Sequence, residues 1–278
     1  MALLDNFAAG SHEDGGCDEG PRYWELAGGS LWAACAILKD LTAGFVDVFD
    51  EPLIRNMGEY ELKMIAANQR MLNVADAAAD YTPNPFLLYH WGKTCKSEQM
   101  MGCAGWLLRG RVLDMDTDRR TPYKYLRCIT TPQLPASLCE TPQKTYIESL
   151  QIAVTRPSGT IGEGLYLAVK GGHNGESHNH NDLGQIVVYS DDQPIFVDAG
   201  AGEYTKRYFG PDRYDVWQTR SDYHNCVTFN GIPQNNGKEY RGSINGDYLL
   251  EAHILPNEPL AMGSVTFYDS KGNILKNE

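Results

Sequence analysis

The feature that most constrains this chain is the stretch Gly171–Asp182. It holds three histidines, three asparagines, two carboxylates and three glycines within twelve positions. Neither a hydrophobic core nor a solvated loop needs so many imidazoles, and the flanking segments 164–170 and 183–189 predict strands. His178 and His180 are one residue apart, so in an extended backbone their side chains point to the same face. The pair therefore indicates two metal ligands, two catalytic groups, or one of each.

Two residues further along could complete a metal site. Asp198 ends an apolar run that begins at Pro194, and His224 precedes the predicted strand Cys226–Phe229. Zinc accepts imidazole nitrogen and carboxylate oxygen in four-coordinate sites, so a His/Asp/His set drawn from neighbouring strands suits it. The spacing leaves a second interpretation equally open, in which Asp198 caps a turn and His224 is a hydrogen-bonded core residue.

The chain changes character near Thr130. The part before it predicts helices, and its Gly28 and Gly29 indicate close helix packing. The expected helices are 24–38, 52–67, 84–92 and 97–108, with a solvated loop at 114–120. After a proline-rich linker, short alternating runs such as 145–155 predict an antiparallel sandwich. We therefore expect a helical domain over 1–128 and a β-sandwich domain over 129–278.

Composition excludes several classes of protein. The net charge of −12 argues against a nucleic-acid partner, and no apolar run reaches transmembrane length. The seven cysteines are scattered without a CxxC pair, so we expect no disulfide framework, which favours a reducing compartment. The first residues do not form a signal peptide, and the localisation stays open between cytoplasm and periplasm. Gly200-Ala-Gly202 lacks a third glycine and a following helix, so nucleotide binding is not expected.

The segment from Gly171 to Gln234 resembles the heparinase II/III-like polysaccharide lyases, a family that includes oligoalginate lyases and heparin or heparan sulfate lyases. The segments that carry the resemblance are 174–182, 197–200, 204–205, 213–217 and 223–225. A second match, Asp14–Trp24, lies far upstream and looks closer to the oligoalginate lyases. The resemblance implies an α+β multidomain fold: the C-terminal part of an (α/α) helical toroid, then an antiparallel β-sandwich, with the active site between them.

The resemblance also implies that the family's machinery extends beyond this sequence. Its toroid is longer than residues 1–128, and its sandwich continues past Glu278. An Asn-His motif that helps to hold the substrate carboxylate would precede Met1. We therefore expect a fragment truncated at both ends.

By resemblance, the chain is a carbon–oxygen lyase that removes the C5 proton of a uronic acid and expels the glycosidic oxygen at C4. Tyr23 matches the catalytic tyrosine of the toroid, and His178 matches a second acid/base or carboxylate-neutralising residue. His180, Asp198 and His224 match zinc ligands. We expect this zinc to be structural, since it would fix the strand that carries His178, and a Lewis-acid role is the alternative.

An acidic protein that acts on a polyanion needs positive charge in its cleft, and arginines near Tyr23 and Asp198 could supply it. The predicted substrate-binding residues are Glu19, Arg22, Asn179, Tyr208, Arg213, Tyr214 and Gln218. The expected partner is an acidic, uronate-containing oligo- or polysaccharide, with no nucleic acid and no membrane. The alternative function is a non-catalytic carbohydrate-binding or scaffold protein on the same fold.

Overall fold

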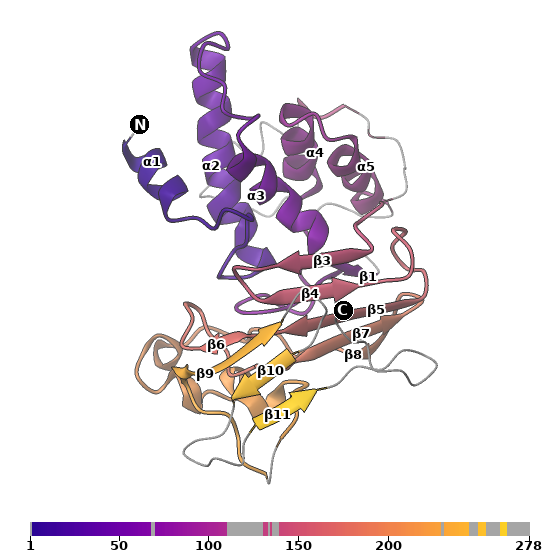
Figure 1. Cartoon of the computed structure of the whole chain (residues 1–278). Helices are drawn as coiled ribbons and strands as arrows, with labels where there is room; N and C mark the ends of the chain where they lie inside the picture. Colours follow the sequence, from indigo (N-terminus) through magenta and orange to yellow (C-terminus); the bar gives the residue numbers. More distant parts are fainter. Residues whose placement is uncertain are drawn as a thin grey trace, which may run out of the picture.

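The computed structural model describes residues 2–67, 70–109, 130–132, 134, 139–228, 231–244, 250–253 and 262–265. Helices gather at one end of the molecule and two antiparallel sheets at the other (Figure 1). The expected α+β class, with helices followed by an antiparallel sandwich, is confirmed. The expected domain boundary at 128/129 and the loop at 114–120 lie outside the described residues.

The helical part contains five described helices. They are α1 (Ala2–Ala9), α2 (Pro21–Leu41), α3 (Pro52–Lys63), α4 (Pro85–Thr94) and α5 (Glu98–Leu107). Proline opens α2, α3 and α4, where its missing N–H costs nothing. The side chains of Asn84 and Ser97 accept hydrogen bonds from the first backbone amides of α4 and α5. These caps explain why the last two helices begin where they do.

The sequence missed two elements of this part. It did not predict α1, and the helix expected over 52–67 ends at Lys63. The β-branched and small residues that follow form a short hairpin, β1 (Ile65–Ala67) with β2 (Arg70–Met71). The segment 72–84 that follows this hairpin contacts the sandwich before α4 begins, since Ala78 pairs with Gly200.

Three buried tryptophans form the centre of the helical core. Trp24 of α2 stacks on Trp91 of α4 with ring centroids 5.1 Å apart, and Trp32 lies beside Trp91 at 6.5 Å. A Cβ atom on Gly29 would lie 2.7 Å from a methyl group of Leu87, so the glycine allows α2 to approach α4. The close packing that the glycines predicted is confirmed.

The sandwich consists of two antiparallel sheets. The first comprises β3 (Lys144–Ile147), β4 (Ile152–Thr155), β5 (Leu165–Lys170), β7 (Ile186–Ser190) and β8 (Gln193–Phe196), in the order β3-β4-β5-β7-β8. The second comprises β6 (Gly172–Asn174), β9 (Gly237–Ile244), β10 (Leu250–His253) and β11 (Met262–Val265), in the order β11-β10-β9-β6. Four short 3-10 helices lie between β8 and β9: η1 (Lys206–Phe209), η2 (Arg213–Asp215), η3 (Trp217–Thr219) and η4 (Ser221–Tyr223).

Several strand predictions need correction. The run 145–155 is a hairpin rather than one strand, because the chain turns at Gln151 with φ of 51°. The apolar run before Asp198 forms the edge strand β8, whose residues are all exposed, and it ends at Phe196. Cys226–Thr228 is not a strand, and Phe229 lies outside the described residues.

Buried hydrogen bonds join the helical part to the sandwich. Arg156 of the sandwich donates to the carbonyl of Ile65 at 2.6 Å, and Asn73 donates to the carbonyl of Asp198 at 2.8 Å. The Asp14 carboxylate accepts from the backbone and the hydroxyl of Ser149 at 2.9 and 2.7 Å. A site between the two parts is therefore held from both sides.

A disulfide joins Cys103 of α5 to Cys139, just ahead of β3. The expectation that the cysteines are unpaired is wrong for this pair, since the sequence separation of 36 residues hid a close approach in space. Disulfides persist in oxidising compartments, so the argument for a reducing one is lost. Cys17, Cys35, Cys95 and Cys226 are free thiols.

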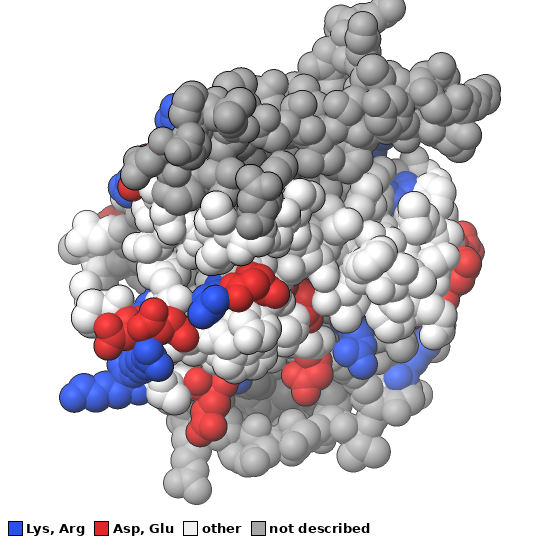
Figure 2. All heavy atoms as spheres, turned by 90° about the horizontal axis from the view of Figure 1, so that it is seen from below, with Lys and Arg blue, Asp and Glu red and all other residues white. Residues whose placement is uncertain are grey.

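Charge on the face in Figure 2 is divided into small groups of both signs, separated by uncharged surface. None of the described helices is long and apolar enough to cross a membrane.

Candidate functional site

His178 lies in the turn between β6 and β7, on the side of the sandwich that faces the helices. The sequence suggested an extended backbone at this position. The structure shows instead that the chain folds through a series of turns. Gly172 opens this segment with φ of 88°, and a Cβ atom there would collide with the Glu176 carboxylate. His178 itself has φ of 53°, which is uncommon for a non-glycine residue and typical of functional sites.

The buried carboxylate of Asp76 is the centre of the site. One of its oxygens lies 2.6 Å from Nδ1 of His178. The other lies 3.4 Å from Nε2 of His180 and 3.3 Å from Nη2 of Arg213, and it accepts a hydrogen bond from the hydroxyl of Tyr208. His178 and His180 therefore lie close together because each contacts one oxygen of the same carboxylate. They do not share the face of a strand.

These contacts set the protonation of the site. Burial by itself raises the pKa of Asp76, but the hydrogen bonds from His178, His180 and Tyr208 outweigh it and hold the pKa well below its usual range. The hydrogen bond to Asp76 raises the pKa of His178, whereas burial lowers the pKa of His180. Asp76 is therefore ionised, and His178 is the imidazole that holds a proton more strongly than usual.

A continuous set of side chains links Tyr23 to His178. The hydroxyl of Tyr23 donates to that of Tyr204 at 2.6 Å, and the ring of Tyr204 packs on Tyr208 with centroids 5.0 Å apart. Tyr208 bonds to Asp76, which bonds to His178. The phenol comes from α2 and the imidazole from the sandwich, so this set of contacts crosses the junction of the two parts.

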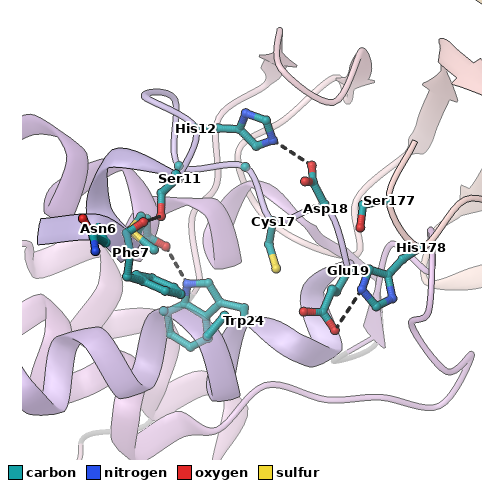
Figure 3. Close-up of a pocket in the computed structure, with 16 residues that line it drawn as sticks. Asn6, Phe7, Ser11, His12, Cys17, Asp18, Glu19, Trp24, Ser177 and His178 are labelled. Atoms are coloured by element: carbon teal, nitrogen blue, oxygen red, sulfur yellow. Dashed lines mark hydrogen bonds and ion pairs between the residues drawn. The ribbon is translucent and has the colours of Figure 1, made fainter. Parts of the chain in front are cut away.

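A pocket of about 330 Å³ opens beside His178. In Figure 3, Glu19 and His178 point toward each other at one end, with Nε2 of His178 3.6 Å from the Glu19 carboxylate. His12 pairs with Asp18 at 2.7 Å over the same pocket, and Phe7 lies toward the far end. Nε2, the ring nitrogen that Asp76 leaves free, is therefore directed at a space that a sugar ring could enter.

Two of the predicted metal ligands are neighbours. The Asp198 carboxylate lies 2.6 Å from Nδ1 of His224, and Nε2 of His224 is buried without a hydrogen-bond partner. The rings of His180 and His224 are 5.3 Å apart, close to the roughly 5 Å expected for two imidazoles on one tetrahedral zinc. Across the described ranges, however, no three His, Cys, Asp or Glu side chains converge as one ligand set. The distances within the pairs Asp198–His224 and His180–His224 fit a zinc site, but the three side chains do not converge on one point. No chemistry below depends on a metal.

The other predicted substrate-binding residues fall into two groups. Glu19 and the exposed Arg22 flank Tyr23 at the start of α2. Asn179, Tyr208, Arg213, Tyr214 and Gln218 lie behind the pocket, buried or half-buried. Arg213 stacks on the Tyr208 ring at 4.1 Å and donates to the carbonyl of Asn179 at 3.1 Å, and the hydroxyl of Tyr214 accepts from Asn179. In this arrangement the second group holds the site together, and its contact with substrate stays a prediction.

The chain matches known proteins in this region. Residues 152–254 match the sequence profile of the heparinase II/III-like C-terminal domain. The match covers less than half of the chain, and it assigns the matched residues to a heparinase II/III-like C-terminal domain. A search among curated protein sequences finds no match.

Several solved structures share the fold of this chain. A heparinase III gene product with methylated lysines superposes with a TM-score of 0.61 at 14% identity, over 92% of this chain and 37% of that one. Another heparinase III gives 0.59 at 12% identity, over 91% and 40%. A mutant heparan sulfate lyase from Pedobacter heparinus gives 0.58 at 12% identity, over 92% and 37%. The chain thus spans well under half the length of these proteins, and the likeness shows the fold.

Sequence reasoning missed Asp76 and the contact between Tyr204 and Tyr23. Asp76 stands among small residues, in Asn73-Val-Ala-Asp-Ala-Ala-Ala79, where one isolated carboxylate signals a buried polar role. Nothing in its spacing ties it to a histidine 102 positions away. The tertiary contact is made because Gly200, at φ of 74°, lets the sandwich backbone bridge to Ala78.

A second buried ionic cluster supports the turn that carries His178. Lys170, at the end of β5, lies 2.8 Å from the Asp182 carboxylate and 3.4 Å from that of Glu176. Burial lowers the pKa of Lys170, yet the two carboxylates outweigh this and raise it. The cluster therefore ties both ends of the turn to the five-stranded sheet.

We predict that Lys170→Met leaves the buried Asp182 carboxylate without its cation. The free energy of unfolding should fall by about 3–5 kcal/mol, because an uncompensated charge remains in the interior. Urea unfolding measures this, with Lys63→Met as the matched control. Lys63 pairs with Glu59 at 3.8 Å near the surface, and its loss should cost less than about 0.5 kcal/mol. Equal costs for both variants would show that the cluster does not hold the turn.

We predict that Asp76→Asn lowers the pKa of His178 toward its ordinary value, because the neutral amide no longer stabilises the imidazolium. Histidine NMR titration measures this directly. The raised pKa of His178 stabilises the fold fully below about pH 6.5, and this is lost as pH rises through the folded value. The lowered pKa of Asp76 stabilises it above about pH 4, and this is lost on acidification.

The stability difference between the parent and Asp76→Asn should therefore be largest between about pH 4 and pH 6.5. Thermal unfolding across pH checks this. An unchanged His178 titration in Asp76→Asn would contradict the assigned charge coupling.

Proposed function

We propose that the protein is a polysaccharide lyase that cleaves uronic-acid-containing glycans by β-elimination. The observation that supports this most strongly is the Asp76 junction, which joins a phenol from the helices to a proton-holding imidazole from the sandwich. The imidazole of His178 lines a pocket of about 330 Å³, and Glu19 and Trp24, near Tyr23 in the sequence, line the same pocket. The family match and the heparinase III neighbours support the same class of reaction.

The reaction explains why these side chains are needed. The C5 proton of a uronate is weakly acidic, so a base must remove it while positive groups stabilise the charge that develops on the carboxylate. An acid must then protonate the leaving oxygen at C4. We assign the base to Tyr23, and we assign the acid to His178, whose pKa is raised by Asp76. Nδ1 of His178 stays on Asp76, so its Nε2 delivers the proton.

The substrate we propose is an alginate oligosaccharide or a heparin-like glycosaminoglycan. The superposed structures are named heparinase III and heparan sulfate lyase, which supports the second. The imidazolium of His178 and the exposed guanidinium of Arg22 supply local positive charge for the uronate carboxylate. The global charge of −12 does not oppose this, because short-range contacts dominate inside a pocket.

We also propose a structural zinc held by His180, Asp198 and His224. The buried, unpaired Nε2 of His224 and the adjacent Asp198 support it. We expect about one zinc per chain by elemental analysis of purified protein, and loss of that zinc in His224→Ala. A chain that is folded and free of metal would reduce the trio to a hydrogen-bonded cluster and leave the lyase proposal intact.

The second candidate is a non-catalytic carbohydrate-binding protein on the same fold. The exposed aromatic side chains of the segment between β8 and β9 favour it, because Phe209, Trp217 and Tyr223 are 67%, 47% and 52% exposed. Aromatic faces at a surface are suited to contacts with sugar rings. The two candidates differ in product: only the lyase creates a C4–C5 double bond.

We predict that the protein produces an unsaturated uronate from alginate, heparin or heparan sulfate. The product is measured by its ultraviolet absorbance. Tyr23→Phe removes the base, so kcat should fall about 10²- to 10⁴-fold. The kcat of His178→Ala should fall by a similar factor.

The control is Tyr89→Phe, which removes a phenol on α4, outside the site, and should retain full activity. Sugar binding by calorimetry without absorbance from any of the three polymers would favour the binding protein.

A further inference from the structure

Tyr204 is the direct partner of the proposed base. Its hydroxyl oxygen lies 2.6 Å from that of Tyr23, across a sequence separation of 181 residues. Tyr204 lies just before η1, and its ring is fixed between Tyr208 at 5.0 Å and Phe209 at 5.1 Å. A short bond between two phenols, one from each part of the molecule, places a second proton at the reacting oxygen.

The surroundings of the two phenols are not equivalent. Burial, the bond to Tyr23 and the nearby charge of Asp76 raise the pKa of Tyr204. The raised pKa keeps the proton on Tyr204. In the resting state Tyr23 donates to Tyr204, and after Tyr23 loses its proton the direction of the bond reverses.

We propose that Tyr204 is the positioning residue of the reaction: it donates a hydrogen bond to the Tyr23 phenolate and orients it toward the C5 proton. The inference rests on the proposed lyase function and deepens it. A hydrogen bond to an ionised oxygen is stronger than one between neutral groups, so Tyr204 favours the ionised form of its neighbour.

The elimination step then balances. The phenolate oxygen of Tyr23 forms a bond to the C5 proton, and the C5–H electron pair becomes the C4–C5 double bond. The bond from C4 to the glycosidic oxygen breaks with its electron pair on that oxygen. His178 gives its Nε2 proton to the oxygen, and water later exchanges one proton with each residue. Tyr204 retains its own proton throughout.

The experiment compares Tyr204→Phe with the parent enzyme. The variant keeps the ring that packs on Tyr208 and Phe209 and loses one hydroxyl. We expect kcat to fall about 10- to 100-fold, the usual worth of one hydrogen bond to a charged group, with KM changed less than about twofold. The acidic limb of the kcat profile should move to higher pH, because the phenolate is harder to form. Unchanged kcat and an unchanged limb would overturn the proposal.

Tyr89→Phe is the control. Tyr89 lies on α4, outside the site, and its ring packs edge-on against His90 at 5.2 Å. Removal of its hydroxyl should alter neither kcat nor the pH profile. An effect equal to that of Tyr204→Phe would reduce the role of Tyr204 to general support of the fold, which overturns the proposal.

A readout that needs no turnover separates this inference from the lyase proposal. Tyr23 is replaced by 3-fluorotyrosine, and its ionisation is followed by fluorine NMR with Tyr or Phe at position 204. We expect the midpoint to lie about one pH unit higher with Phe, and equal midpoints overturn the inference. If the protein gives no product but shows the shift, the lyase proposal fails, and the hydrogen bond from Tyr204 to the Tyr23 phenolate is still supported.

Fluorotyrosine at position 204 should shift the pH profile in the direction opposite to Tyr204→Phe. This test does not depend on the folding of the Phe variant. Fluorine makes the phenol a stronger donor and enlarges the ring only slightly. The acidic limb should then move to lower pH, and movement to higher pH would contradict the proposed direction of the bond.

Discussion

The structure depends on one buried carboxylate. Asp76 is completely covered, and a lone charge in that position would destabilise the fold severely. Four groups from the sandwich compensate it: His178, His180, Tyr208 and Arg213. Because the acid comes from the helical part and its partners come from the sandwich, the charge is tolerated only when the two parts are packed together. Formation of the site and docking of the two parts are therefore one event.

This coupling gives each histidine a different task. His178 is only partly buried, and its bond to Asp76 keeps a proton on a ring that faces the pocket. His180 is nearly fully buried, so its imidazole is kept neutral and serves as a hydrogen-bonding group between Asp76 and Tyr208. Two residues that look equivalent in the sequence are separated by burial into an ionisable group and a structural one.

Further hydrogen bonds and ion pairs around Asp76 hold the site in place. Lys170 ties the turn of His178 to the five-stranded sheet, while Asn73 and Arg156 fasten the chain near Asp76 to the sandwich. The tyrosines of the segment between β8 and β9 complete the contact with Tyr23. Under the proposed lyase function such support matters, because small displacements of a proton-donating side chain lower the rate.

The sequence by itself determined that a helical part precedes a strand-rich part, and it located the packing glycines of α2 and the turn rich in imidazoles, since these follow from local periodicity and residue type. It also pointed to Tyr23 and His178 through their motifs. Tertiary structure alone decided that Asp76 and Tyr204 join them, that Cys103 meets Cys139, and that the edge strand β8 stays exposed. Those outcomes depend on which distant segments pack together, and one-dimensional spacing carries no record of that.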